Sequence, residues 1–185
     1  MRTLWWTTLL LALALSCNGN GGGGGAEPAN ANVTGTAAGL DFTFVPAQAG
    51  ALFEATRPGA GELNVFLCET GCPALGAAAP ADETRSLILS VEGTTAELRG
   101  GGVFPIGDGG YGRAELQRDG QVVADEALSG EIVIESSDLR DGGLTVGTFQ
   151  LETVSGGSLS GFFEAPIEGL SGPIVLLESL QSVDR

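Results

Sequence analysis

Between residue 33 and the C-terminus, apolar and polar residues alternate in short runs that are separated by Gly, Pro and Asp-Gly. The longest alternation covers residues 144–154, and shorter runs cover residues 62–68, 86–91 and 130–135. A period of two places alternate side chains on opposite faces of a β-strand, and a helical period is hard to find here. The pattern therefore predicts a domain built from β-strands.

The other predicted strands are shorter or less regular in pattern. They cover residues 40–45, 51–56, 94–98, 102–106, 112–117, 121–125 and 158–165, and residues 174–180 fit either a strand or a short helix. About nine or ten strands joined by short loops predict an all-β antiparallel meander. We expect this meander to close into a β-barrel or a β-sandwich, as a single domain over residues 33–185.

An eight-stranded outer-membrane barrel is the competing architecture at this chain length. Such a barrel carries girdles of aromatic residues at both membrane interfaces. The two Trp residues lie at positions 5 and 6, which leaves Tyr111 as the one later residue suited to a girdle. The pattern therefore favours a barrel or sandwich that lies outside the bilayer.

The first seventeen residues follow a different pattern. Arg2 precedes an apolar run from Leu4 to Leu15, which is followed by Ser16 and Cys17. The run is shorter than the roughly 20 residues that a helix needs to cross a bilayer. A positive residue, a short apolar run and a small residue are typical of a secretory signal, which is removed from the mature protein.

The stretch from Leu13 to Cys17 (LALSC) resembles a bacterial lipobox, the motif cleaved by signal peptidase II. The resemblance implies that Cys17 becomes the mature N-terminus and carries a diacylglycerol and an N-acyl chain such as palmitate. Several acyl chains hold a protein stably on a lipid bilayer. In lipoproteins of enteric bacteria, Asp after the lipidated Cys retains the protein in the inner membrane. Asn18 stands at that position here, so the resemblance implies that the protein lies in the outer membrane, on either its periplasmic or its surface face. The alternatives are a plain secretory signal or an uncleaved anchor.

A glycine-rich segment over residues 18–32 follows the lipobox. Five consecutive glycines, Gly21 to Gly25, cannot repay the entropy of ordering, so the segment is predicted to be a disordered tether. With the Gly-Thr-Phe of residues 147–149 and the Leu-Ser-Gly-Phe of residues 159–162, the signal and tether resemble Gly-rich-tethered lipoproteins of myxobacteria and their relatives. The resemblance implies a lipoprotein and names no ligand.

Composition excludes several kinds of chemistry. The chain has no His, and its eight cationic residues are all Arg. These absences exclude a Ser-His or Cys-His pair, a zinc site with His ligands, a Schiff-base lysine and a P-loop lysine. A formal net charge of −15 argues against nucleic acid as a partner. We attribute the acidity to solubility or to salty surroundings, with attraction of cationic partners as the alternative.

Cys68 and Cys72 are the cysteines that remain once Cys17 is acylated. An even number of cysteines in an exported protein predicts a disulfide. The bridge would close a loop of about five residues and stabilise the fold by about 2 kcal/mol. Free thiols, a redox pair or half of a metal site are the alternatives.

Carboxylates are the other reactive groups present in quantity. Glu164 and Glu168 flank Pro166, Asp138 and Asp141 share a glycine-rich stretch, and Asp108 lies between glycines. Asp-Gly in a β protein is most often a turn, and we expect turns here. Calcium binding and glycoside hydrolysis are the alternatives, but no EF-hand loop or nonapeptide repeat supports them.

These observations predict no catalytic residues, no cofactor and no metal site. We expect a membrane-anchored, non-enzymatic bacterial lipoprotein whose β domain has a binding or surface-structural role, with a small hydrophobic ligand or a protein as the open choices of partner. A lipocalin-like carrier of a small hydrophobic ligand is the first alternative, and a carboxylate-dependent glycosidase is the second. A carrier's interior would be lined by Phe42, Phe44, Phe149, Phe162 and Phe163.

Overall fold

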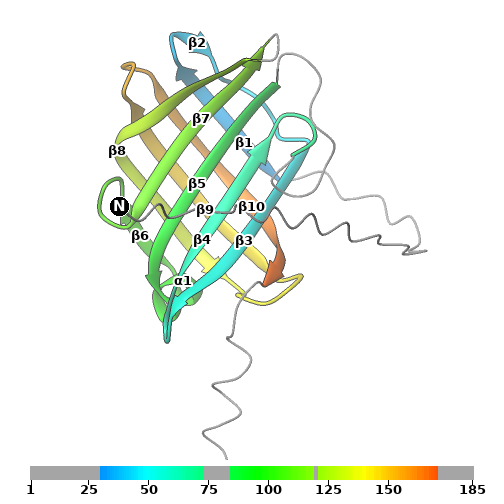
Figure 1. Cartoon of the computed structure of the whole chain (residues 1–185), viewed down its shortest axis with the longest axis vertical. Coiled ribbons are helices and arrows are strands. Elements are labelled where there is room, and N and C mark those ends of the chain that lie inside the picture. Colours follow the sequence, from blue (N-terminus) through cyan, green and yellow to red (C-terminus); the bar gives the residue numbers. More distant parts are fainter. Residues whose placement is uncertain (1–29, 73–83, 119–120, 171–185) are drawn as a thin grey trace, which may run out of the picture.

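The computed structural model describes residues 30–72, 84–118 and 121–170 (Figure 1). These residues form an all-β fold with one short helix, which confirms the predicted fold class. In chain order the elements are β1 (Ala31–Ala37), β2 (Leu40–Asp41), β3 (Gln48–Arg57), β4 (Ala60–Cys68), β5 (Thr84–Thr94), α1 (Thr95–Gly100), β6 (Gly102–Pro105), β7 (Gly110–Arg118), β8 (Gln121–Ser137), β9 (Leu144–Thr153) and β10 (Ser158–Leu170).

The strands form one large sheet whose hydrogen bonds close into a ring. The ring runs β3–β4–β5–β7–β8–β9–β10 and returns to β3. It is not a regular barrel, because β10 and β3 meet in parallel through two residue pairs with a register shift between them, whereas the other ring pairings are antiparallel. Outside the ring, β1 pairs with β10, β2 pairs with β1, and β6 pairs with β8.

The interior of the ring is filled by side chains. Successive residues of a strand point to opposite faces, so the burial of β4 and β9 switches at nearly every position. The largest fully buried side chains are Phe163, Leu63, Leu67, Leu87, Leu89, Leu98, Ile132, Ile134, Leu151, Leu159, Ile167 and Val33. A single hydrophobic core therefore joins the strands on both sides of the ring.

Two reciprocal pairs of glycine and phenylalanine join β9 to β10. Gly161 pairs with Phe149, and Phe163 pairs with Gly147. A Cβ atom placed on Gly147 would lie 2.6 Å from the Phe163 ring, and one on Gly161 would lie 2.7 Å from the Phe149 ring. Each aromatic ring thus covers the glycine on the neighbouring strand, and Phe162 faces outward with 38% of its surface exposed.

The strand predicted over residues 94–98 is wrong, because the chain forms the helix α1 there. Thr94 and Glu97 build a capping box: Glu97 N donates to Thr94 Oγ1 (3.2 Å), and Thr94 N donates to Glu97 Oε2 (2.8 Å). These bonds satisfy backbone donors that a helix start otherwise leaves free. Leu98 is fully buried, so α1 covers one end of the ring, while β2 lies at the other (Figure 1).

Three other segments differ from their predicted form. Residues 121–125 and 130–135 belong to the single strand β8, which crosses from β7 to β9 with irregular register near Gly130. Residues 40–45 form only the short β2 and a bridge at Phe44. β1 begins at Ala31, two residues before the predicted domain start, and residues 174–180 lie outside the described ranges.

Candidate functional site

Several residues singled out in the sequence lie apart from one another. Cys17 is outside the described ranges. Glu164 and Glu168 both lie on β10, whereas Asp108 follows β6 in a turn whose Asp108 N donates to Pro105 O (3.0 Å). In the described ranges, no group of three or more His, Cys, Asp or Glu side chains is arranged to hold a metal ion.

Asp138 and Asp141 lie in the loop between β8 and β9. Asp138 forms an ion pair with Arg140 at the surface, where both side chains are at least half exposed. The backbone of the same loop folds back on itself, since Arg140 N donates to Asp138 O (2.6 Å) and Gly143 N donates to Arg140 O (2.8 Å). These contacts give the two aspartates the turn environment that the sequence predicted.

The structure has a disulfide between Cys68, at the end of β4, and Cys72. Their Cα atoms are 5.5 Å apart, within the range that a disulfide spans. The loop is also held by Gln48, whose Oε1 accepts a hydrogen bond from Cys72 N (2.9 Å). Glu69 in the loop accepts from Arg85 Nη1 (2.7 Å) and from Arg85 N (3.1 Å). The loop is thereby fixed to both β3 and β5.

A row of three glutamates, which the sequence did not predict, crosses three neighbouring strands. Glu54 on β3 pairs with Glu62 on β4, which pairs with Glu92 on β5. Directly opposed residues have Cβ atoms about 4.5–5.5 Å apart, so like charges meet here. Ser90 Oγ donates to Glu62 Oε1 (2.7 Å). The register of the strands brings these carboxylates together, since Glu62 lies eight positions after Glu54, and Glu92 lies thirty positions after Glu62.

Asp125 is a buried carboxylate that joins two loops at one end of the ring. Its Oδ2 accepts hydrogen bonds from Ala38 N (2.7 Å) and Ser155 Oγ (2.5 Å), and its Oδ1 accepts one from Ser155 N (3.1 Å). Burial alone would raise the pKa of Asp125, but hydrogen bonds from Ser155, Ala38 and Thr153 outweigh it and lower the pKa. The carboxylate thus accepts hydrogen bonds from both loops and holds them together at this end of the ring.

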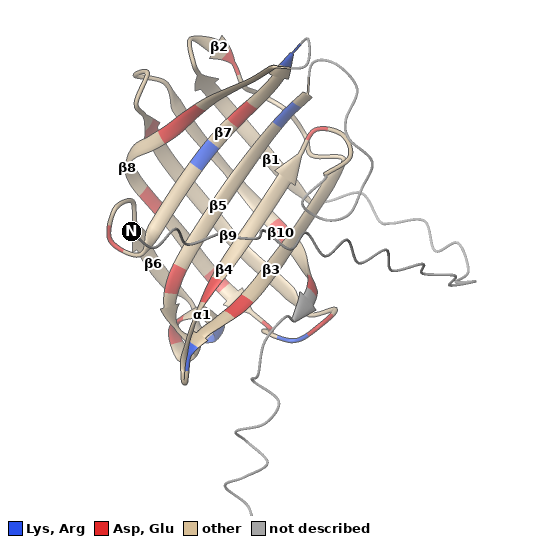
Figure 2. Ribbon diagram, viewed as in Figure 1, with Lys and Arg blue, Asp and Glu red and all other residues tan. Residues whose placement is uncertain are grey.

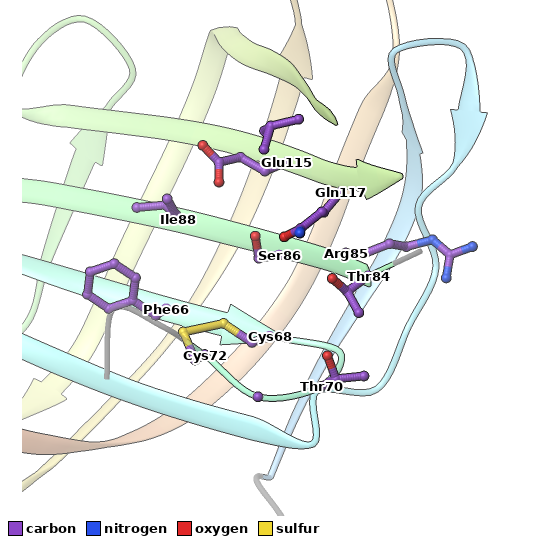
Figure 3. A pocket seen from close by; sticks show the side chains of 12 residues that line it. Phe66, Cys68, Thr70, Cys72, Thr84, Arg85, Ser86, Ile88, Glu115 and Gln117 are labelled. Atoms are coloured by element: carbon purple, nitrogen blue, oxygen red, sulfur yellow. A yellow bond between two sulfur atoms is a disulfide. The ribbon is translucent and has the colours of Figure 1, made fainter. Parts of the chain in front are cut away.

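A hollow of about 160 Å³ lies on the outer face of β4, β5 and β7, beside the disulfide loop (Figure 3). It forms around Ser86, a small outward residue that pairs with Cys68 on one side and Glu115 on the other. Figure 3 shows Ser86 between Gln117 and the disulfide. Larger side chains surround this small one: Phe66, Ile88, Glu115, Gln117 and Val122.

A second cavity of about 240 Å³ lies where β2 meets the ends of β5 and β7. Its lining residues are Leu40, Asp41, Arg85, Leu116 and Arg118. Arg85 Nε donates to Asp41 O (3.2 Å), and the Asp41 carboxylate accepts from Thr43 N (3.0 Å). The hydrogen bonds from Thr43 and the charge of Arg85 hold the pKa of Asp41 below its usual range. Arg85 thus lies near the carboxylates of both Asp41 and Glu69, and Arg118 is the other arginine that lines the cavity.

Four of the five phenylalanines that a carrier would need lie in the core. Phe42, Phe44, Phe149 and Phe163 are each at most 6% exposed, and the rings of Phe42 and Phe44 meet edge to face with centroids 5.6 Å apart. They pack against one another and against aliphatic side chains. One of the two cavities described above lies on the outer surface of the sheet, and the other lies at one end of the ring of strands. Neither is lined by these four phenylalanines.

Acidic residues are distributed over the surface of the domain. Figure 2 shows them on β3, β5, β7 and β8, with arginines interspersed on β5 and β7. In the described ranges, no helix has the length and hydropathy needed to cross a bilayer. Comparisons of the chain with protein-family models, with curated proteins and with solved structures found no match.

Proposed function

We propose that this chain is a lipid-anchored protein of the bacterial cell envelope, and that its β domain acts by binding and not by catalysis. The observation that carries this proposal is the order of residues at the N-terminus. Arg2, the apolar run, Ser16 and Cys17 are followed at once by a glycine-rich segment. A lipidated Cys17 would attach the domain to the outer membrane without a spanning helix.

The packing of the domain supports a role in binding at its outer surface. The core residues that the structure describes are buried and form one packed cluster, which includes four of the five phenylalanines that a carrier would need as its lining. A rigid core instead holds the outward side chains of β4, β5 and β7 in fixed positions. This arrangement gives the carrier hypothesis little support and favours a site on the outer face.

The anchor is tested with the full chain, expressed with its own N-terminus in a bacterium that processes lipoproteins. We expect a membrane-bound protein whose intact mass equals residues 17–185 plus acyl chains. In Cys17→Ala, we expect neither cleavage by signal peptidase II nor acylation. Globomycin, which inhibits signal peptidase II, should prevent cleavage of the wild-type chain.

A matched control is the double variant Cys68→Ala, Cys72→Ala, which removes two cysteines far from the signal and should be acylated normally. Separation of inner and outer membranes on a density gradient then locates the acylated protein. An unacylated soluble chain, or acylation that persists in Cys17→Ala, would overturn the proposal.

A further inference from the structure

The hollow beside the disulfide loop has the size of one six-membered ring. Its volume is about 160 Å³, and a cavity of about 150 Å³ takes up one benzene molecule. It opens on the outer face of the sheet, where Ser86 forms the floor and larger side chains form the walls. A ligand can therefore enter without any displacement of the core.

The walls of the hollow combine apolar and polar groups. Phe66 and Ile88 are half-buried and adjacent across β4 and β5, and Val122 lies beyond Gln117 on β8. The polar groups of the lining include the Ser86 hydroxyl, the Gln117 amide and the Glu115 carboxylate, which together can both donate and accept hydrogen bonds. A hydrocarbon ligand would bury the Ser86 hydroxyl and the Gln117 amide and offer them no hydrogen bond, which is costly.

The charges around the hollow are already paired. Arg113 Nε lies 2.7 Å from Glu115 Oε1, and Arg85 Nη1 lies 2.7 Å from Glu69 Oε1. The charge of Glu115 is the first cause of the raised pKa of Arg113. A charged ligand would have to displace one member of a pair. The hollow therefore suits a neutral ligand.

A sugar ring has the chemistry that these walls require. Its C–H groups form apolar faces that can lie against Phe66 and Ile88, while its hydroxyls both donate and accept hydrogen bonds. We propose that the hollow beside the Cys68–Cys72 loop binds one neutral sugar ring. The inference rests on the proposed binding function and specifies its ligand class.

The rim of the hollow is held before any ligand arrives. The loop is attached to β3 through Gln48 and to β5 through the Glu69–Arg85 contacts, in addition to the disulfide. A site that is ordered in advance loses less entropy when it binds. Even so, a single ring makes few contacts, and we expect a dissociation constant on the order of 1 mM.

The experiment measures binding of single rings to the full chain by saturation-transfer NMR and NMR titration. The neutral probes are the methyl glycosides of glucose, galactose, mannose and N-acetylglucosamine. Glucuronate is the charged counterpart, and cyclohexanol is a six-membered ring with one hydroxyl. We expect at least one neutral sugar to bind more tightly than both comparison probes.

Two variants locate the binding on the protein. Ser86→Met fills the hollow from its floor, and Phe66→Ala removes an apolar wall; we expect each to weaken sugar binding by about tenfold or more. Ser160→Met, on the exposed face of β10, is the matched control and should bind as the unchanged chain does. Melting curves establish that each variant is folded, and Ser86→Met tests the site even if Phe66→Ala unfolds.

Three results would overturn the inference: no neutral sugar of the panel binds, glucuronate or cyclohexanol binds as well as the sugars, or Ser86→Met leaves binding unchanged. The test is separate from that of the anchor. A chain that is acylated at Cys17 but binds no sugar refutes only this inference. A chain that binds sugar but is not acylated refutes the proposed anchor.

Discussion

Replacing Asp125 by Asn should destabilise the domain in a manner that depends on pH. The carboxylate accepts hydrogen bonds from Ala38 N, Ser155 N and Ser155 Oγ, and only 6% of the residue is exposed. The Asn amide keeps one acceptor oxygen but presents an NH₂ group where the second oxygen accepted. At least one donor then loses its partner, and the two loops lose part of their connection.

The magnitude follows from the number and the surroundings of these bonds. A hydrogen bond to a charged group contributes about 1.5–3 kcal/mol to stability. Where solvent can reach the donor, a hydrogen bond to water restores part of this free energy after the substitution. Ser155 is exposed and Ala38 is half-buried, so the compensation by water is partial. We expect Asp125→Asn to lower the free energy of unfolding by about 2 kcal/mol at pH 7. The corresponding fall in melting temperature is about 6 °C.

The pH dependence identifies the charge as the cause. The pKa of Asp125 in the folded protein lies below its ordinary value of 3.8, so the stabilisation is fully present above that value. It is lost as the pH falls through the folded-state pKa, where the carboxylate becomes protonated. The difference between the unchanged chain and Asp125→Asn should therefore be constant from pH 7 to pH 5 and shrink below pH 3.8.

Urea unfolding followed by circular dichroism, repeated at each pH, measures this difference. Asp138→Asn is the matched control, because its ion pair with Arg140 is exposed and contributes little. Two results would refute the reasoning: Asp125→Asn as stable as the unchanged chain at pH 7, or a stability difference that does not change between pH 7 and pH 2.

Three further changes test the packing, each by thermal or urea unfolding. Glu92→Lys replaces a repulsion with Glu62 by an attraction and should stabilise the domain by about 0.2–1 kcal/mol, an effect that high salt removes; a loss of stability would contradict the register. Cys72→Ser should cost about 2 kcal/mol, and reductant should then have no further effect; equal stability would show that the bridge does not form. Gly161→Ala places a Cβ 2.0 Å from a backbone oxygen and should cost about 2 kcal/mol or more, whereas Gly100→Ala, with open space around it, should be neutral or slightly stabilising. Equal effects of the two substitutions would refute this account of the crowding.

The sequence predicted the strands best where alternation is long and bounded by turn residues. Residues 144–154 correspond to β9 and residues 62–68 to β4, because one buried face imposes a period of two on the chain. The helix α1 was missed because six residues are too few to establish a helical period, although Thr94 and Glu97 carry the capping-box signature. The crossing strand β8 was divided in two, because a register shift interrupts its alternation.

The hollow beside the disulfide loop could not be predicted from the sequence. Its floor and walls come from β4, β5, β7 and β8, and Ser86 faces Cys68 and Glu115 only because the strands pair in one particular register. A shift of one residue would turn Ser86 inward and destroy the site. The row of Glu54, Glu62 and Glu92 depends on register in the same way.

The sequence by itself determined the fold class and predicts a lipid anchor at the N-terminus, because each depends on a local pattern of neighbouring residues in the chain. Alternation specifies which face of a strand is buried, and an apolar run followed by Ser16 and Cys17 predicts a lipid anchor without reference to the fold. Only the tertiary structure decided which strands meet, how β10 closes the ring onto β3, and which outward side chains surround Ser86. The physical reason is that strand pairing depends on core packing and hydrogen bonds between residues distant in the chain, and a single sequence does not display those contacts.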